Sequence, residues 1–247
     1  MRNIWTIAKR EYKIYFSSTL GYIVILLIVG TIGGVFALTL INLSSNPFGG
    51  GQAPDSSIVT GPMGILLIIA APALTMRLLA DEQRMGTLEL MLTAPVRDWE
   101  LVVGKWLGSL LFLLTIIAMT TIFVLITHTM VTPGIDQQVM LSGYLGVILL
   151  ASASLAIGVG ISSLFNNQFA AFFVSLFVLL FIMWWLIGVP AQLLPSSGEI
   201  FSYLDIKTHY FPFTEGIINL SSVVYFLSLT ALGLFIGSVA IETRRWR

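Results

Sequence analysis

The sequence predicts an all-α membrane protein with a surface helix at its N-terminus, six membrane-spanning helices and both termini in the cytoplasm. Three observations support this prediction. Of the 247 residues, 57% are hydrophobic and only 10% are charged, against about 25% charged in an average soluble domain. The few charges leave long uncharged stretches between them, and the basic residues gather on one side of the resulting spans. We expect residues 1–247 to form one transmembrane domain.

The uncharged stretches locate the spans, because a helix needs about 20 apolar residues to cross a bilayer. A charge at the centre of such a helix costs at least about 2.5–3.5 kcal/mol. The stretch 137–198 is long enough for two spans, and Asn166-Asn167-Gln168 divides it. With that division the sequence predicts six spans, lying within residues 14–54, 56–76, 106–135, 137–198 (two spans) and 216–241.

The basic residues predict the orientation, because cytoplasmic loops are rich in Lys and Arg. With six spans, both termini and the connection after the second span share one side, which carries most of the basic residues, whereas Lys207 lies opposite. Asp55 and Asp136 also fall on the external side. The basic residues of the cytoplasmic side are Arg2, Lys9, Arg10, Lys13, Arg77, Arg84, Arg97, Lys105, Arg244, Arg245 and Arg247.

Within residues 1–19, the stretch 2–16 is typical of an amphipathic helix in the headgroup layer. Basic residues cluster on one side of its helical projection, and aromatic and apolar residues occupy the other. Glu11 falls among the apolar positions, which this pattern does not explain. A flexible basic leader is the alternative.

The segment 81–98, between the second and third spans, is the most polar part of the chain. Leu88, Met91 and Leu92 repeat with helical spacing, and Pro95 ends the pattern because proline cannot continue a helix. We therefore expect a short cytoplasmic helix over 87–94, lying parallel to the membrane. Asp98 is expected to cap the third span.

The external segment 189–220, before the sixth span, is bounded by prolines yet rich in aromatic residues. It is expected to lie at the outer interface or to dip into the bundle, where protein shields irregular backbone. Small residues four apart occur in several spans and predict close helix packing. They are Gly30 and Gly34; Ser154, Gly158 and Ser162; and Gly233 and Gly237.

Several kinds of chemistry are not expected. The sequence has no cysteine and two histidines, so no catalytic, metal or cofactor site is predicted. The zero net charge argues against a nucleic-acid partner. A phosphate-binding P-loop requires Gly-x-x-x-x-Gly-Lys-Ser/Thr, whereas Trp106 follows the only Gly-Lys pair, Gly104-Lys105. We expect no enzyme activity in this chain. A secondary transporter or channel remains the alternative function, and a membrane enzyme is disfavoured.

Two motifs carry a family resemblance. Arg84-x-Gly86-Thr87-Leu88-Glu89-Leu90-x-Leu92-Thr93-x-Pro95-Val96, followed by Trp99-Glu100-Leu101-x-x-Gly104-Lys105, resembles the cytoplasmic signature of type 2 ABC transporter permeases. The later stretch His209-Tyr210-Phe211-x-Phe213-x-x-Gly216-Ile217-Ile218, with Tyr225-Phe226 and Glu242-x-Arg244-Arg245-Trp246, is similar to the gliding-motility-associated and nitrous-oxide-reductase-maturation permeases.

The resemblance implies a non-catalytic exporter subunit in the inner membrane of a prokaryote, surrounded by lipid. It also implies two copies of a cytoplasmic ABC ATPase and a second permease subunit, identical or paralogous. A coupling helix would contact the ATPase through Arg84, Gly86, Thr87, Leu88, Glu89, Leu90, Leu92 and Pro95. An external gate would include Tyr203, His209, Phe211 and Gly216. The spans are filled with Leu, Ile, Phe and Val, which favours a lipidic or amphipathic substrate.

Overall fold

In a computed structural model of the chain, the described residues 2–45, 55–86, 97–131, 134–186, 201 and 203–245 form helices and no β-strand. Six helical segments of this part are long and apolar enough to cross a membrane, which confirms the predicted number. The elements are α1 (Arg2–Ser17), α2 (Thr19–Ser45), α3 (Ser57–Thr75), α4 (Ala80–Arg84), α6 (Asp98–Met130), α7 (Gln137–Ser162), α8 (Gln168–Leu176), the π-helix η1 (Phe177–Leu186), α11 (Ile206–Thr214) and α12 (Leu220–Arg245).

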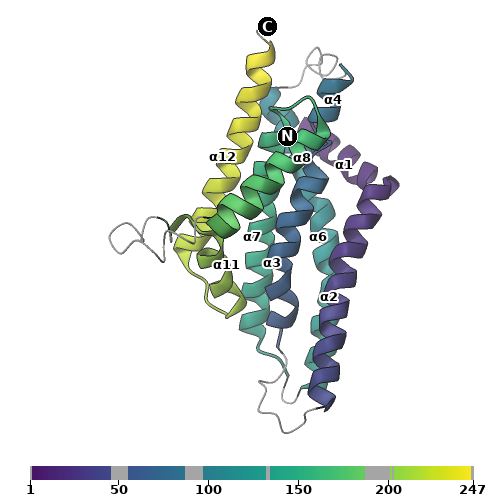
Figure 1. Cartoon of the computed structure of the whole chain (residues 1–247), viewed down its shortest axis with the longest axis vertical. Helices are drawn as coiled ribbons and strands as arrows, with labels where there is room; N and C mark the ends of the chain where they lie inside the picture. The colour runs from purple at the N-terminus through teal and green to yellow at the C-terminus, as the bar shows by residue number, and fades with distance from the viewer. Residues whose placement is uncertain are drawn as a thin grey trace.

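The spans pack around α7, which lies between α3, α6 and α12 (Figure 1). The described ends of α1 and α12 lie at the same end of the bundle as α4, while the α6–α7 connection lies at the opposite end. The described residues of the part assigned to the cytoplasm therefore gather at one end, which we call the polar end.

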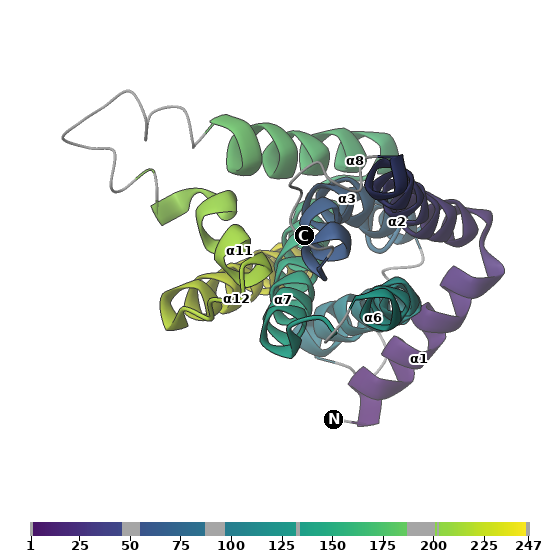
Figure 2. The same ribbon diagram turned by 90° about the horizontal axis from the view of Figure 1, so that it is seen from below.

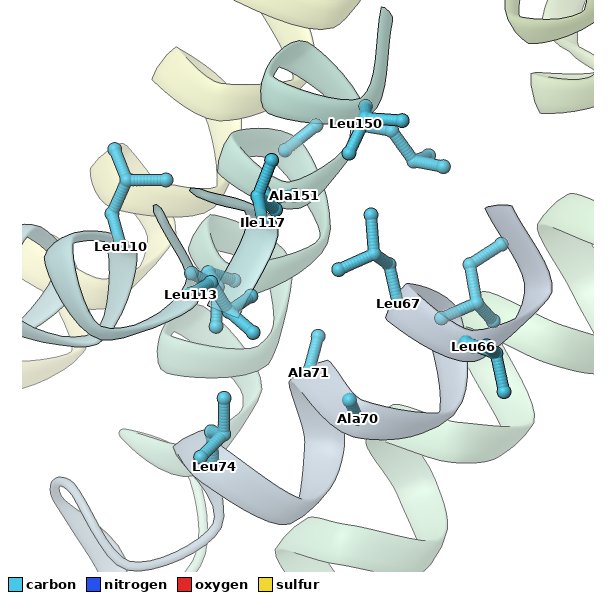
Figure 3. Close-up of a cluster of buried hydrophobic side chains, with 14 of the residues drawn as sticks. Leu66, Leu67, Ala70, Ala71, Leu74, Leu110, Leu113, Ile117, Leu150 and Ala151 are labelled. Atoms are coloured by element: carbon cyan, nitrogen blue, oxygen red, sulfur yellow. The ribbon is translucent and has the colours of Figure 1, made fainter. Parts of the chain in front are cut away.

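The core consists of aliphatic side chains from the central helices (Figure 3). Leu67 and Leu74 of α3 face Leu113 and Ile117 of α6 and Leu150 of α7, and none of them is more than 4% exposed. Lipid tails are as apolar as leucine, so close packing rather than exclusion of water holds such helices together.

Small residues allow that close packing on α7 and α12, as the four-residue spacing predicts. A Cβ atom on Gly160 would lie 2.6 Å from the Gly233 carbonyl oxygen, and one on Gly158 would lie 2.3 Å from the Thr75 hydroxyl oxygen. On α2 the same spacing is misleading. Gly30 and Gly34 are exposed, and within the described chain no other helix packs on them.

The predicted surface helix is confirmed, with bounds one residue longer than expected. Figures 1 and 2 show α1 running across the polar end and turning sharply into α2. Its buried face carries Ala8, Glu11 and Tyr15, while Trp5 is exposed. The flexible-leader alternative is therefore wrong.

Two helices begin with a polar side chain that caps their first turn. Asn167 caps α8 by accepting from the Phe169 N–H, so the polar triplet does divide the long apolar stretch. Asp136 caps α7 in the same way. The predicted cap of the third span is wrong, because α6 begins at Asp98 itself. Arg97 occupies the cap position, and the Glu100 carboxylate accepts from its backbone N–H at 3.1 Å.

Candidate functional site

A buried group of charges joins three elements at the polar end. Lys105 of α6 is 1% exposed. Its Nζ atom lies 3.1 Å from Oε1 of Glu11 in α1 and 2.7 Å from Oε1 of Glu82 in α4. Arg10, which is half exposed, contacts the same two oxygens at 3.1 and 3.3 Å. We call Arg10, Glu11, Glu82 and Lys105 the charge cluster.

The buried charges of the cluster need one another, because a buried charge without an opposite charge nearby destabilises the folded protein. Removing one partner of a buried ion pair typically costs about 3–5 kcal/mol, since the other charge stays buried without compensation. Two carboxylates facing one ammonium would leave an excess negative charge, and the Arg10 guanidinium balances it. Because the Arg10 side chain is half exposed, the cluster lies at the edge of the bundle rather than in its middle.

Two glycines of α6 let α1 approach closely enough for these pairs to form. A Cβ atom on Gly104 would lie 2.8 Å from Ile7 Cβ, and one on Gly108 would lie 2.7 Å from Glu11 Cβ. The backbone of α6 is therefore the surface on which α1 rests. The glycines are four residues apart, so they lie on one face of α6, with Lys105 between them.

Tyr15 makes a second tie from α1 to the bundle. Its hydroxyl group donates to the Leu74 carbonyl oxygen near the end of α3, at 2.9 Å. Burial raises the pKa of the Tyr15 phenol well above its ordinary value, and the nearby Glu11 carboxylate adds to the rise. The phenol therefore keeps its proton and this hydrogen bond over the physiological pH range.

α4 is fixed to α7 where the chain leaves α3. The Ser162 hydroxyl oxygen lies 3.4 and 3.2 Å from the backbone nitrogens of Leu79 and Ala80, whose N–H groups donate to it. The Gln83 side chain donates to the Ser163 carbonyl oxygen at 2.8 Å. The start of the predicted cytoplasmic segment is thus attached to α1, α6 and α7.

Of the predicted coupling residues, the structure places two. Arg84 is exposed at the last turn of α4. Gly86 has a φ of +68°, a left-handed conformation that glycine adopts without strain. The rest of that set lies outside the described residues, together with the predicted helix 87–94: Thr87, Leu88, Glu89, Leu90, Leu92 and Pro95.

Part of the predicted external segment packs inside the bundle. The Tyr210 hydroxyl group of α11 donates to the Thr60 carbonyl oxygen of α3. Phe213 of α11 lies against Gly146 of α7, where a Cβ atom would be 2.6 Å from it. Of the two placements expected for this segment, dipping into the bundle fits the buried face of α11, which packs on α7 and also contacts α3 and α12. Figure 2 shows α11 at the side of the bundle, beside α7 and α12.

The predicted gate residues separate into three places. Tyr203 lies edge-on to His209, with ring centroids 5.1 Å apart, and its carbonyl oxygen accepts from His209 Nε2 at 2.8 Å. The other ring nitrogen, Nδ1, forms a hydrogen bond with the Ser222 hydroxyl at 3.0 Å. Phe211 lies beside Trp184 instead. Gly216, with a φ of +90°, forms the turn towards α12.

His209, one of the residues assigned to the external gate by the family resemblance, is buried in this structure. It is 5% exposed, both ring nitrogens are bonded, and its ring stacks on Tyr225 at 4.1 Å. Tyr203 and Phe211 are about half exposed and remain the accessible aromatic groups of this segment.

The charge cluster was not predicted from the sequence, although two features of the sequence indicate it. Glu11 interrupts the apolar side of the surface helix, and Lys105 lies within the start of an apolar helix. Opposite charges at two such positions indicate a buried pair. Among the residues that the structure describes, no group of three or more His, Asp or Glu side chains could hold a metal ion.

Comparison with known proteins gave one family match. A family model described as "ABC-2 family transporter protein" matches residues 52–242. This range includes five of the six spans, the segment 81–98 and α11. A comparison with curated proteins gave no match.

Proposed function

The chain belongs to the ABC-2 transporter family, and on that basis we propose that it is the permease subunit of an ATP-driven exporter. Energy would enter through residues 81–98, which we propose to contact a separate cytoplasmic ATPase. The observation that carries the proposal is the family match over residues 52–242, because it covers this segment and the spans on both sides of it. Six apolar helices agree with a multi-pass membrane transport protein.

The contacts of the polar end support the proposed route of coupling. α4 forms the start of the segment and α6 follows it, and Glu82 of α4 is paired with Lys105 of α6. Glu11 adds α1 to the same cluster. A displacement of the segment would therefore move α1, α3 and α6 together, because these ties leave little slack between them.

The proposed assembly has two ATPase copies and a second permease subunit, identical or paralogous, in the inner membrane of a prokaryote. Both termini and the segment 81–98 face the cytoplasm in this proposal, as the basic residues indicate. The relationship to gliding-motility-associated or nitrous-oxide-reductase-maturation permeases belongs to the proposal as well. The proposed substrate is lipidic or amphipathic, since the spans offer few polar groups to solvate a charged one.

Two substitutions test the coupling segment. Glu89→Lys reverses a charge in it, and a lost interfacial charge pair typically costs about 2–5 kcal/mol of binding. Gly86→Pro fixes φ near −65° where the structure has +68°, so it redirects the chain as it enters the segment. Both variants should insert in the membrane, because no span is changed.

The measurement is co-purification with the ATPase, together with transport by reconstituted vesicles. We expect both variants to lose ATPase binding, or to keep binding while ATP hydrolysis no longer drives transport. The matched control is Lys207→Glu, a charge reversal on the proposed external side, which should keep ATPase binding. Wild-type behaviour of both Glu89→Lys and Gly86→Pro would refute the coupling role and favour a secondary transporter.

A further inference from the structure

A groove lies between the surface helix and the third span, away from the charge cluster. It has a volume of about 500 Å³ and two kinds of wall. α1 contributes Trp5, Lys9, Tyr12 and Lys13, while α6 contributes Leu111, Leu114, Thr115 and Ala118. One wall is therefore basic and aromatic, and the other is almost wholly apolar.

The two lysines have no acidic partner in the part of the chain that the structure describes. Lys9 and Lys13 are exposed and one helical turn apart, so both ammonium groups stand at the same side of α1. Arg10, by contrast, forms ion pairs with Glu11 and Glu82. The groove thus has two available cations at its α1 side.

The apolar wall continues from these cations along α6 into the membrane-spanning region. Leu111 to Ala118 cover about 10 Å of helix at 1.5 Å per residue. The polar group in this wall is already satisfied, because the Thr115 hydroxyl donates to the Phe112 carbonyl oxygen at 2.6 Å. A ligand of this groove needs an anionic group at one end and a long apolar chain at the other.

We propose that the groove binds an anionic glycerophospholipid of the adjoining leaflet. Its phosphate lies between Lys9 and Lys13, and one acyl chain lies along Leu111, Leu114 and Ala118. Trp5 and Tyr12 flank the headgroup, where aromatic side chains are enriched in membrane proteins. The bound lipid fills the space between α1 and α6 on the side that the charge cluster does not reach.

This proposal does not depend on the transport function, since it concerns only the contact between two described helices. A basic residue near an anionic membrane surface gains about 1 kcal/mol, which corresponds to about a five-fold change in affinity. Lys9→Gln/Lys13→Gln should therefore weaken binding of the anionic lipid about 25-fold, without an effect on a zwitterionic lipid.

The test is native mass spectrometry of the full chain in detergent, titrated with phosphatidylglycerol or phosphatidylcholine of equal chain length. We expect the wild type to prefer phosphatidylglycerol by at least ten-fold and the double variant to lose the preference. Ala118→Trp should weaken both lipids by filling the apolar end, with Lys9 and Lys13 intact. Lys207→Gln removes a cation elsewhere and should leave the preference unchanged.

A thermal unfolding series on the same samples keeps folding separate from binding. Phosphatidylglycerol should raise the midpoint of the wild type and of Lys207→Gln, but not that of Lys9→Gln/Lys13→Gln. Equal affinity of the wild type for both lipids would overturn the proposal, as would an unchanged preference in the double variant. Competition by millimolar glycerol phosphate would also overturn it, because the groove would then be a site for a free phosphate.

Discussion

Glu11 and Lys105 are separated by 94 residues, yet Glu11 Oε1 and Lys105 Nζ lie 3.1 Å apart. Both side chains are almost fully buried, at 7% and 1% exposure. The contact joins the surface helix to the third span. Because Glu82 shares the same ammonium group, it also joins them to the segment that we propose contacts the motor.

The losses of stability from removing Lys105 and from removing Glu11 should not be additive, because the two side chains form one ion pair. Lys105→Met leaves Glu11 and Glu82 buried without their shared cation, and we expect a loss of about 3–5 kcal/mol in the free energy of unfolding. Glu11→Gln/Lys105→Met should lose clearly less than the sum of the two single variants. The free energies of unfolding of the wild type, the two single variants and the double variant, measured in detergent, give the interaction energy between the two charges. Glu242→Gln, an exposed acidic position on α12, is the control and should stay within about 0.5 kcal/mol. Strictly additive losses would show that the two charges do not interact.

The contact of α1 with α6 should tolerate no side chain at Gly108. A Cβ atom there would lie 2.7 Å from Glu11 Cβ and 2.8 Å from the Ala8 carbonyl oxygen. Gly108→Ala should therefore cost about 1–3 kcal/mol, because α1 has to move away. Gly34→Ala is the matched control, since its added Cβ would meet no atom within 4 Å outside the nearby backbone of its own helix. Thermal unfolding of both variants compares them, and equal midpoints would mean that α1 is not docked as described.

In α11 and at Tyr203, three residues before it begins, substitutions that affect function should differ from those that affect stability. Tyr203→Ala and Phe211→Ala change half-exposed rings, so we expect altered transport or substrate-stimulated ATP hydrolysis with the complex intact. His209→Ala leaves the Tyr203 carbonyl oxygen without its donor, which typically costs about 1–3 kcal/mol. Transport and unfolding measured on all three variants check this division. Loss of the ATPase from the Tyr203→Ala or Phe211→Ala complex would contradict an external role.

The predicted topology has a direct test, because the chain contains no cysteine. Single cysteines at positions 55 and 89 can be labelled in intact cells with an impermeant thiol reagent. Position 55 should react at once, and position 89 only after the cells are permeabilised. The reverse pattern would mean that the whole bundle is inverted, with the polar end outside the cell.

The number and approximate limits of the spans followed from the sequence, because the cost of placing a residue in the bilayer is a local property of that residue. A gap between charges therefore locates a span without knowledge of its neighbours. The break at Asn167 and the amphipathic helix before Thr19 are local in the same sense. Their predictions were correct within one or two residues.

Four-residue spacing of glycines did not reveal which helix faces are packed. Gly30 and Gly34 have the same spacing as Gly104 and Gly108, yet only the second pair has a helix against it. Spacing fixes which residues share a face of their own helix. Whether another helix covers that face depends on the arrangement of the whole bundle.

The sequence by itself determined which segments form helices and which of them can span a membrane. The tertiary structure decided which buried charges are neutralised and that α11 packs its buried face into the bundle. Glu11 and Lys105 each look unfavourable in their own helix, and only their contact makes both burials stable. α11 lies in the bundle because Gly146 admits Phe213 and the Thr60 carbonyl oxygen accepts from Tyr210. These energies depend on distances between helices, which no local pattern of residues contains.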